Sequence, residues 1–292
     1  MLTLPIPSEH WGGSMSGTHG DDSASSADPA SPARYLILDT ESVPDGRLLA
    51  KVKYPTDNLA PAEAVARAQE EARAKSPTGS DFLPVTFQYP VAVCILRVGA
   101  DFAIQALTCL DAPRYQSSKI VEDFWKGVEH YGYARLVTFN GRGFDLPLLE
   151  FAAFRYGCCA RGYYQNGRKR YNGGNHLDLL EWLTNYGACR LDGGLNLFSK
   201  LLGKPGKMEV SGDQVYQMFM DKRLQEINDY CMYDTIDTYF VFLRTRVLAG
   251  ECTLDQEKEL VSKTKDWLIA KCAELPALQK YLDNWGDWEP WP

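Results

Sequence analysis

The chain is predicted to form a mixed α/β fold, in which helices cover a β-sheet. Three observations predict this. Short apolar runs that are typical of buried strands are concentrated in the first half of the chain. Helical spacing of apolar residues follows in the second half, and helical segments also separate the strands. With 292 residues, of which 45% are hydrophobic, the chain is long enough for one large domain with appendages.

The first ordered element is expected at Tyr35–Leu38, an apolar run that reads as a buried strand. Residues 1–33 are rich in Ser, Gly, Ala, Asp and Pro, and we predict a disordered N-terminal tail there. After Pro44 the pattern predicts a loop and then a helix over Pro61–Lys75, with its proline in the first turn. These segments form a helical insertion over about 45–88.

The remaining elements alternate between strands and helices. Val91–Val98 and Phe102–Leu110 are predicted to form a hairpin around Gly99-Ala100-Asp101. Further segments are a helix over Ser118–Tyr131, a strand over Arg135–Phe139, a helix from Asp145 to about Tyr156, and helices over 224–248 and about 254–272. The polar stretch 157–176 and the breaks at Gly187, Gly193-Gly194 and Lys204-Pro205-Gly206 read as connections.

The charge balance narrows the classes of function. The net charge is −7 and the isoelectric point is near 5.2, whereas a protein that coats long nucleic acid is normally basic. An acidic chain can still act on nucleic acid if it holds only a short end and metal ions supply local positive charge. The composition therefore argues against a histone-like role but not against a nuclease.

The cysteines and the apolar runs indicate a cytoplasmic protein. Eight cysteines are spread along the chain without C-x-x-C spacing, so free thiols are expected, and a zinc site is not. No run of about 18 apolar residues is present, so we expect no membrane-spanning helix. The N-terminus does not read as a secretion signal.

Two carboxylates end the first predicted strand, in Leu38-Asp39-Thr40-Glu41. Residues i and i+2 of a strand point to the same face, so Asp39 and Glu41 would enter one cleft. Paired carboxylates repel each other unless protons or cations lie between them, and such oxygen ligands suit Mg²⁺ or Mn²⁺. An exposed acidic turn is the alternative interpretation.

A third carboxylate follows another predicted strand, in Asn140-Gly141-Arg142-Gly143-Phe144-Asp145. Asp145 is either a helix N-cap or a site residue. A fourth lies in the helix that contains Tyr230 and Asp234, which are four residues apart and share one face. There the alternative is a core tyrosine with a surface aspartate.

Together, D-x-E, N-x-x-x-F-D and Y-x-x-x-D in this order resemble the DEDD superfamily of 3′→5′ exonucleases. Tyr230 stands four residues before Asp234, which is typical of the DEDDy branch. Phe82-Leu83-Pro84, His176-Leu177-Asp178-Leu179 and 202–207 further resemble a bacterial family of predicted exonucleases related to the proofreading domain of family B DNA polymerases. The resemblance covers about 34–250, and Gln88 stands where that family is expected to have histidine.

The resemblance implies an RNase H-like sheet flanked by helices in an exonuclease domain over 34–250, followed by a C-terminal helical extension and an aromatic, acidic tail over 251–292. It also implies two divalent cations, Mg²⁺ or Mn²⁺, bridged by Asp39. Glu41 and Asp234 would complete the ligands of one cation, and Asp145 would support the other. Tyr230 would orient the attacking water. Asp178 is expected to have a structural role rather than to bind metal.

Substrate contacts are expected around this site. By family analogy, Thr40, Asn140 and Phe144 would contact the terminal nucleotides, with core packing as the alternative for Phe144. Two basic segments could hold single-stranded DNA or RNA by charge and stacking, or could simply be solvated. One contains Arg168, Lys169 and Arg170, and the other contains Lys200, Lys204 and Lys207.

Three questions stay open at this stage. The same carboxylates could cut RNA or DNA, because contacts with the 2′-hydroxyl decide that choice. The chain could instead be a catalytically silent nucleic-acid-binding or polymerase-accessory module, although intact carboxylates weigh against this. The tail over 284–291 either packs on the domain or docks on a replication or repair protein.

Overall fold

The computed structural model describes residues 32–290 except 133, 170–173 and 209–211. The predicted disordered tail lies almost wholly outside the described residues, since only positions 32 and 33 of it are included. Arg170, one of the predicted substrate contacts, also lies outside them.

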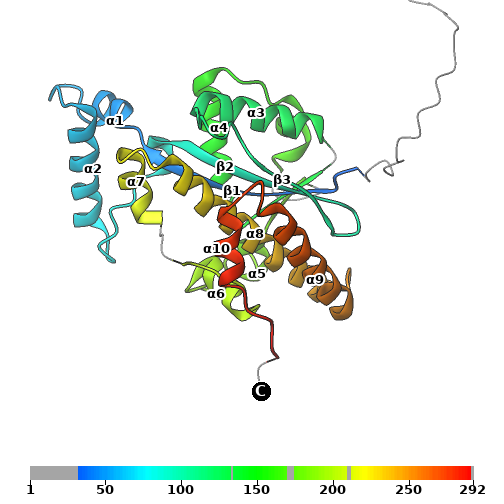
Figure 1. The fold of residues 1–292 in the computed structure, drawn as a ribbon. Coiled ribbons are helices and arrows are strands. Elements are labelled where there is room, and N and C mark those ends of the chain that lie inside the picture. The colour runs from blue at the N-terminus through cyan, green and yellow to red at the C-terminus, as the bar shows by residue number, and fades with distance from the viewer. Residues whose placement is uncertain (1–31, 133, 170–173, 209–211, 291–292) are drawn as a thin grey trace, which may run out of the picture. The chain divides into compact units, whose positions relative to one another are not determined.

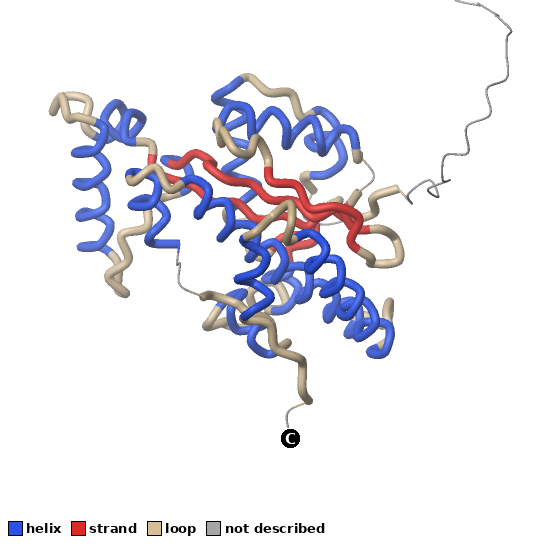
Figure 2. Tube along the Cα trace, in the orientation of Figure 1, coloured by secondary structure: helices blue, strands red, loops and turns tan. Residues whose placement is uncertain are grey.

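Within the described part of the chain, five strands form one mixed sheet in the order β3-β2-β1-β4-β5. The strands are β1 (Tyr35–Pro44), β2 (Gln88–Val98), β3 (Ile104–Cys109), β4 (Arg135–Thr138) and β5 (His176–Asp178). β1, β2 and β3 pair antiparallel, whereas β4 and β5 run parallel to β1. Figure 2 shows these strands between two groups of helices. The predicted RNase H-like α/β fold class is therefore confirmed.

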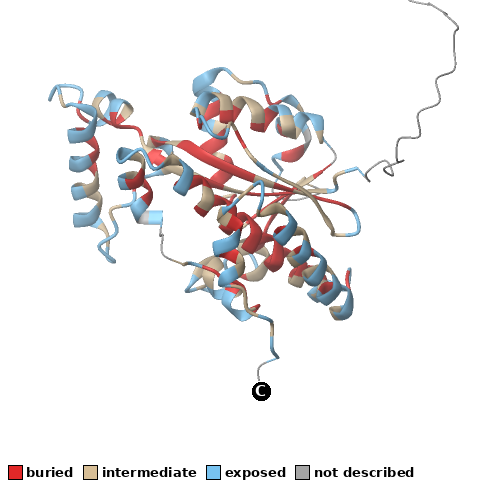
Figure 3. Cartoon of the chain, in the orientation of Figure 1, coloured by how far each residue is buried: buried red, intermediate tan, exposed pale blue. Residues whose placement is uncertain are grey.

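Helices cover both faces of the sheet (Figure 1). α3 (Ser117–His130) and α4 (Asp145–Tyr156) cover one face, and α8 (Leu224–Leu248) covers the other. The alternation of side chains along β1 explains this, because Leu36 and Leu38 join the core under α3 and α4 while Ile37 joins the core under α8. The central strands are consequently buried on both sides, whereas the edge strand β3 is only partly covered (Figure 3).

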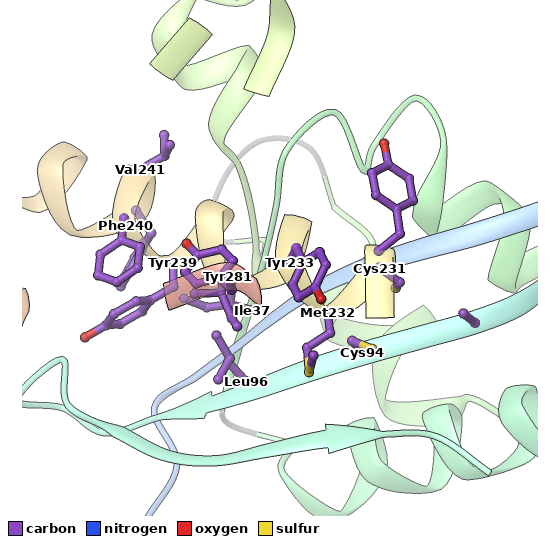
Figure 4. Packing of buried hydrophobic residues seen from close by; sticks show 14 of the residues in the cluster. Ile37, Cys94, Leu96, Cys231, Met232, Tyr233, Tyr239, Phe240, Val241 and Tyr281 are labelled. Atoms are coloured by element: carbon purple, nitrogen blue, oxygen red, sulfur yellow. The ribbon is translucent and has the colours of Figure 1, made fainter. Parts of the chain in front are cut away.

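The long helix α8 is the centre of the second layer. Its side chains are buried on nearly every side, as expected of a helix enclosed by other elements. Figure 4 shows Tyr239 of α8 close to Ile37 of the sheet, in the core cluster that also contains Leu96 and Phe240. The helix predicted over about 254–272 is present as α9 (Leu254–Lys271), and a further helix that was not predicted, α10 (Ala277–Asp283), follows it. No described helix is long and apolar enough to cross a bilayer.

The insertion between β1 and β2 has its own small core. It contains α1 (Gly46–Lys53), α2 (Pro61–Lys75) and the short 3₁₀ turn η1 (Val85–Phe87), packed around a cluster that includes Leu49 and Leu83. α2 has the predicted bounds, but 46–53 was predicted to be a loop. The sequence feature that could have predicted α1 is its N-cap residue, Asp45. The Asp45 carboxylate accepts a hydrogen bond from the backbone N–H of Leu48 over 3.0 Å.

Short elements complete the region between β4 and α8. They are η2 (Tyr163–Gly167), α5 (Leu179–Leu183), α6 (Gly194–Leu201), η3 (Gly212–Gln214) and α7 (Val215–Met220). The sequence pattern predicted no strand where β5 lies, because a strand of three residues carries too little periodicity to be recognised. β5 nevertheless positions Asp178, which holds the loop beside the candidate site.

Candidate metal centre and substrate cleft

Asp39 and Glu41 lie in the middle of β1, not at its end. The apolar run predicted that the strand stops near Leu38, but β1 continues to Pro44. Only the parallel pairing with β4 stops early, at Ile37 opposite Val137. Beyond this point β1 has no strand on that side among the described residues, and this leaves room beside the two carboxylates. A β-bulge follows directly after Glu41.

Helix α8 brings a third carboxylate to this position. One carboxylate oxygen from each of Asp39, Glu41 and Asp234 lies within 4.8 Å of the other two. Tyr230, one turn earlier in α8, shares a side-chain hydrogen bond with Asp234. The Cys231 thiol donates to the backbone carbonyl of Asp39 over 3.2 Å, which fastens α8 to β1 at the site. Three of the four predicted carboxylates thus converge.

Asp145 lies beside this group but is held separately. It is the first residue of α4, where Phe144 is the N-cap and has no side-chain cap hydrogen bond, so the N-cap interpretation of Asp145 was wrong. Its carboxylate accepts a hydrogen bond from the Thr40 hydroxyl over 2.7 Å and is buried. Asp145 is close enough to Asp39 to raise the pKa of that carboxyl.

The loop from β4 to α4 is fixed by Asp178. The backbone N–H groups of Asn140 and Arg142 donate to its carboxylate over 2.9 and 2.8 Å. Asp178 also caps α5 by accepting from the N–H of Leu180 over 3.0 Å. The expected structural role of Asp178 is therefore confirmed. Asn140 has a φ of +67°, a conformation that asparagine tolerates better than most residues.

The electrostatics of the site favour a cation. Burial, and then the neighbouring negative charges, raise the pKa of Asp39 and Glu41 well above the usual range. Burial raises the pKa of Asp145 and of Asp234 to about 7. Such shifts mean that these carboxylates are withdrawn from water and that the described side chains supply too little positive charge to keep them ionised. Clustered carboxylate oxygens of this kind are the ligands that Mg²⁺ and Mn²⁺ prefer, so the donor set fits a divalent cation.

A cleft of about 560 Å³ opens beside the carboxylates. Asp39 and Asp234 line it together with Asn140, Asn196 and Lys207. Asn196 follows the paired glycines at 193–194, which the sequence pattern marked only as a break. A glycine pair next to polar residues was the available signal for this wall of the cleft.

The three lysines of the second basic segment, Lys200, Lys204 and Lys207, do not form one surface patch. Lys207 is exposed in the cleft, and its charge offsets a small part of the rise in the pKa of Glu41 and Asp234. Lys204 is instead buried, and its ammonium donates to the carbonyl of Gly286 over 3.0 Å. Lys200 donates to the carbonyl of Pro205. Only Lys207 is therefore available to a substrate in the cleft.

Only some of the other predicted substrate contacts lie at the cleft. Asn140 lines the cleft, whereas the hydroxyl of Thr40 is directed to Asp145. Phe144 is half-buried, so it is neither a core residue nor free in solvent. Arg168 binds Glu150 on the outer side of α4, and Lys169 is exposed next to it, so among the described residues neither lines the cleft.

The described part of the C-terminal tail packs on the domain. The Trp285 and Phe240 ring centroids are 5.1 Å apart, and the N–H of Gly286 donates to the carbonyl of Gly203 over 2.8 Å. Of the two interpretations of the tail, packing is therefore found as far as Trp288, whose ring lies 4.4 Å from the Arg244 guanidinium. Trp291 lies outside the described residues.

A mixed sheet with a partly buried carboxylate cluster beside a cleft fits the class of nucleases. Residues 80–285 match the family described as predicted 3′→5′ exonucleases related to the exonuclease domain of PolB, and this chain belongs to that family. The matched residues include Asp145, Tyr230 and Asp234, while Asp39 and Glu41 precede them. The match also includes α9 and α10, although the resemblance was expected to end near 250.

Comparison with solved structures finds a family B DNA polymerase from the hyperthermophilic archaeon Pyrobaculum calidifontis. The sequences are 14% identical, the TM-score is 0.47, and the similarity covers 74% of this chain. The chain spans only 25% of the length of that polymerase. The comparison with curated proteins finds no match.

Proposed function

We propose that this protein is a divalent-metal-dependent 3′→5′ exonuclease that removes nucleotides from the 3′ end of single-stranded nucleic acid, with DNA as the favoured substrate. The observation that carries the proposal is the convergence of Asp39, Glu41 and Asp234 within 4.8 Å in a member of a predicted exonuclease family. A silent binding module would have no need of such mutually repelling groups.

Two cations would be held by the four carboxylates. Asp39 would contact both, with Glu41 and Asp234 around one and Asp145 supporting the other. When bound, the cations would lower the pKa of the attacking water and neutralise charge on the leaving 3′ oxygen. The hydrogen bond from Thr40 would keep Asp145 in its position, because it fixes the carboxylate against β1.

Tyr230 would orient the attacking water instead of removing its proton. An ordinary phenol has a pKa of about 10 and is a poor base at neutral pH. Here burial, followed by the charges of Asp234, Glu41 and Asp39, raises the pKa of Tyr230 further. The hydroxyl therefore remains protonated, and it can place a water molecule near the carboxylates while it stays bound to Asp234.

Asn140 and Lys207 are the proposed contacts for the end of the substrate. Both line the cleft with Asp39 and Asp234. The amide of Asn140 can bond to the sugar or phosphate of the last nucleotide, and Lys207 brings a positive charge to an otherwise acidic cleft. Positive charge is needed there because the substrate phosphates would otherwise face only carboxylates.

A degradation assay tests the proposal. The protein is incubated with Mg²⁺ or Mn²⁺ and with 5′-labelled single-stranded DNA, duplex DNA or RNA. Asp39→Ala removes one cluster carboxylate, and Asp255→Ala removes a carboxylate whose side chain is 94% exposed. The expected result is a ladder that shortens from the 3′ end, is lost in Asp39→Ala and persists in Asp255→Ala. If RNA is degraded faster than DNA, RNA is the favoured substrate. No cleavage of any substrate would reject the proposal.

A further inference from the structure

Helix α4 carries an exposed row of apolar side chains. Phe144, Pro147, Phe151 and Phe154 recur at intervals of three and four residues, so they share one face of the helix. Phe151 is 47% exposed and Phe154 is 90% exposed. Two such rings in solvent on one helical turn form an apolar surface that usually marks an interaction site.

This row begins at the candidate site. Phe144 immediately precedes Asp145, and its ring lies 5.7 Å from the ring of Phe82, which is 57% exposed. From Phe144 the row follows α4 for about 15 Å, at 1.5 Å per residue. Phe82, Phe144, Phe151 and Phe154 are called the aromatic row below. It runs from the end of α4 that carries Asp145 to the far end of the helix.

Cationic groups lie along one side of the aromatic row. The Arg168 guanidinium bonds to the carboxylate of Glu150 over 2.9 Å, which neutralises the acid that directly precedes Phe151 in α4. The same guanidinium lies 5.7 Å from the centre of the Tyr164 ring, which is 51% exposed. Lys169 is exposed next in the chain. With Arg168 and Glu150 balancing each other, Lys169 leaves this region with a net positive charge, beside the further aromatic ring of Tyr164.

Resting on the proposed nuclease activity, we infer that the single strand leaves the active site along α4, with its bases stacked on the aromatic row and its phosphates beside Arg168 and Lys169. Aromatic faces combined with cations bind single strands without sequence preference, because every base has a face that can stack. The position of Phe144 directly before Asp145, and four residues after the cleft residue Asn140, favours this occupant over a protein.

The double variant Phe151→Ala with Phe154→Ala tests the inference. Both side chains point into solvent and alanine is a good helix former, so the fold is expected to persist. The matched control is Leu248→Ala with Ile269→Ala, which removes two aliphatic side chains that are 67% and 54% exposed elsewhere. Thermal unfolding verifies that both variants are folded.

Rates are measured on a trinucleotide and on a DNA strand of about 15 nucleotides. Loss of two stacking positions should raise KM for the longer strand at least about tenfold, while kcat and the rate on the trinucleotide stay as in the wild type. The control variant should match the wild type on both substrates. An unchanged KM of the double variant would overturn the inference, and so would an equal loss on both substrates.

Binding without turnover separates this inference from the proposed function. Fluorescence anisotropy of the longer strand with Ca²⁺ in place of Mg²⁺ should show the same weakening in the double variant. If the wild type cleaves nothing, the proposed function fails. If the wild type cleaves and the double variant binds equally well, only the path along α4 fails, and a protein partner would then be the better occupant of the row.

Discussion

The hydroxyl of Thr40 donates a hydrogen bond to the carboxylate of Asp145 over 2.7 Å, although 105 residues separate the two in the chain. This contact joins β1 to the start of α4 and fixes the one candidate metal ligand that lies apart from the other three. It also explains why Thr40, which stands between Asp39 and Glu41, is buried and does not face the cleft.

Thr40→Val should therefore impair catalysis by displacing Asp145. Valine has the shape of threonine but cannot donate, so a buried carboxylate loses a hydrogen bond of the kind that contributes about 1.5–3 kcal/mol. We expect turnover to fall roughly ten- to a hundredfold, since small misplacements of reacting groups are costly. Single-turnover degradation measures the effect, and Thr40→Ser, which keeps the hydroxyl, should stay near the wild type. Wild-type turnover in the valine variant would contradict the role.

Tyr230→Phe should slow turnover and leave metal binding nearly intact. The substitution removes the hydroxyl that we propose to orient water but leaves all four carboxylates in place. A reduction of about a hundredfold is typical for the loss of one positioned catalytic group. Degradation rates and a titration of Mn²⁺ give the two readouts, and Tyr233→Phe is a neighbouring control on the same helix. Unchanged turnover would remove Tyr230 from the mechanism.

Gly141→Ala should destabilise the loop that precedes Asp145. An added Cβ would lie 2.3 Å from the Thr138 hydroxyl oxygen, which itself accepts from the N–H of Gly141 over 3.1 Å. Overpacking of this kind costs about 1–3 kcal/mol in the free energy of unfolding. Gly127→Ala is the matched control, because nothing lies within 4 Å of its added Cβ and alanine favours a helix. Denaturant unfolding of both variants decides the prediction, and equal stabilities would refute it.

His176 should make the protein less stable in acid. Burial, followed by the charges of Arg142 and Arg135, lowers the pKa of His176 from its usual 6.5 to about 3. The unfolded chain therefore binds an additional proton between these values, and stability falls as pH falls through that window. His176 alone changes the free energy of unfolding by at most about 1.4 kcal/mol per pH unit.

The test compares the free energy of unfolding of the wild type and of His176→Asn between pH 6.5 and pH 4. Carboxylates titrate in both proteins, so their effect cancels in the difference. The wild type should lose more stability than the variant over this range, and parallel curves would show that His176 does not contribute.

Strong local patterns explain which elements could be predicted. α2, α8 and α9 have long helical periodicity, and the β2–β3 hairpin has a turn between two apolar runs, so neighbouring residues alone define them. α1 and β5 are short, and they form because Asp45 caps one and β4 pairs with the other. Such contacts leave little trace in the local pattern.

The sequence by itself determined the fold class, the motif order that assigns the family, and the residue types that suit a divalent cation. Only the tertiary structure decided which side chains share a site. It places Asp234 within reach of Asp39 and Glu41, ties Asp145 to Thr40, and separates Lys207 from Lys204. The physical reason is that local periodicity depends on adjacent residues, whereas these contacts depend on where β1 loses its parallel partner and where α8 crosses the sheet.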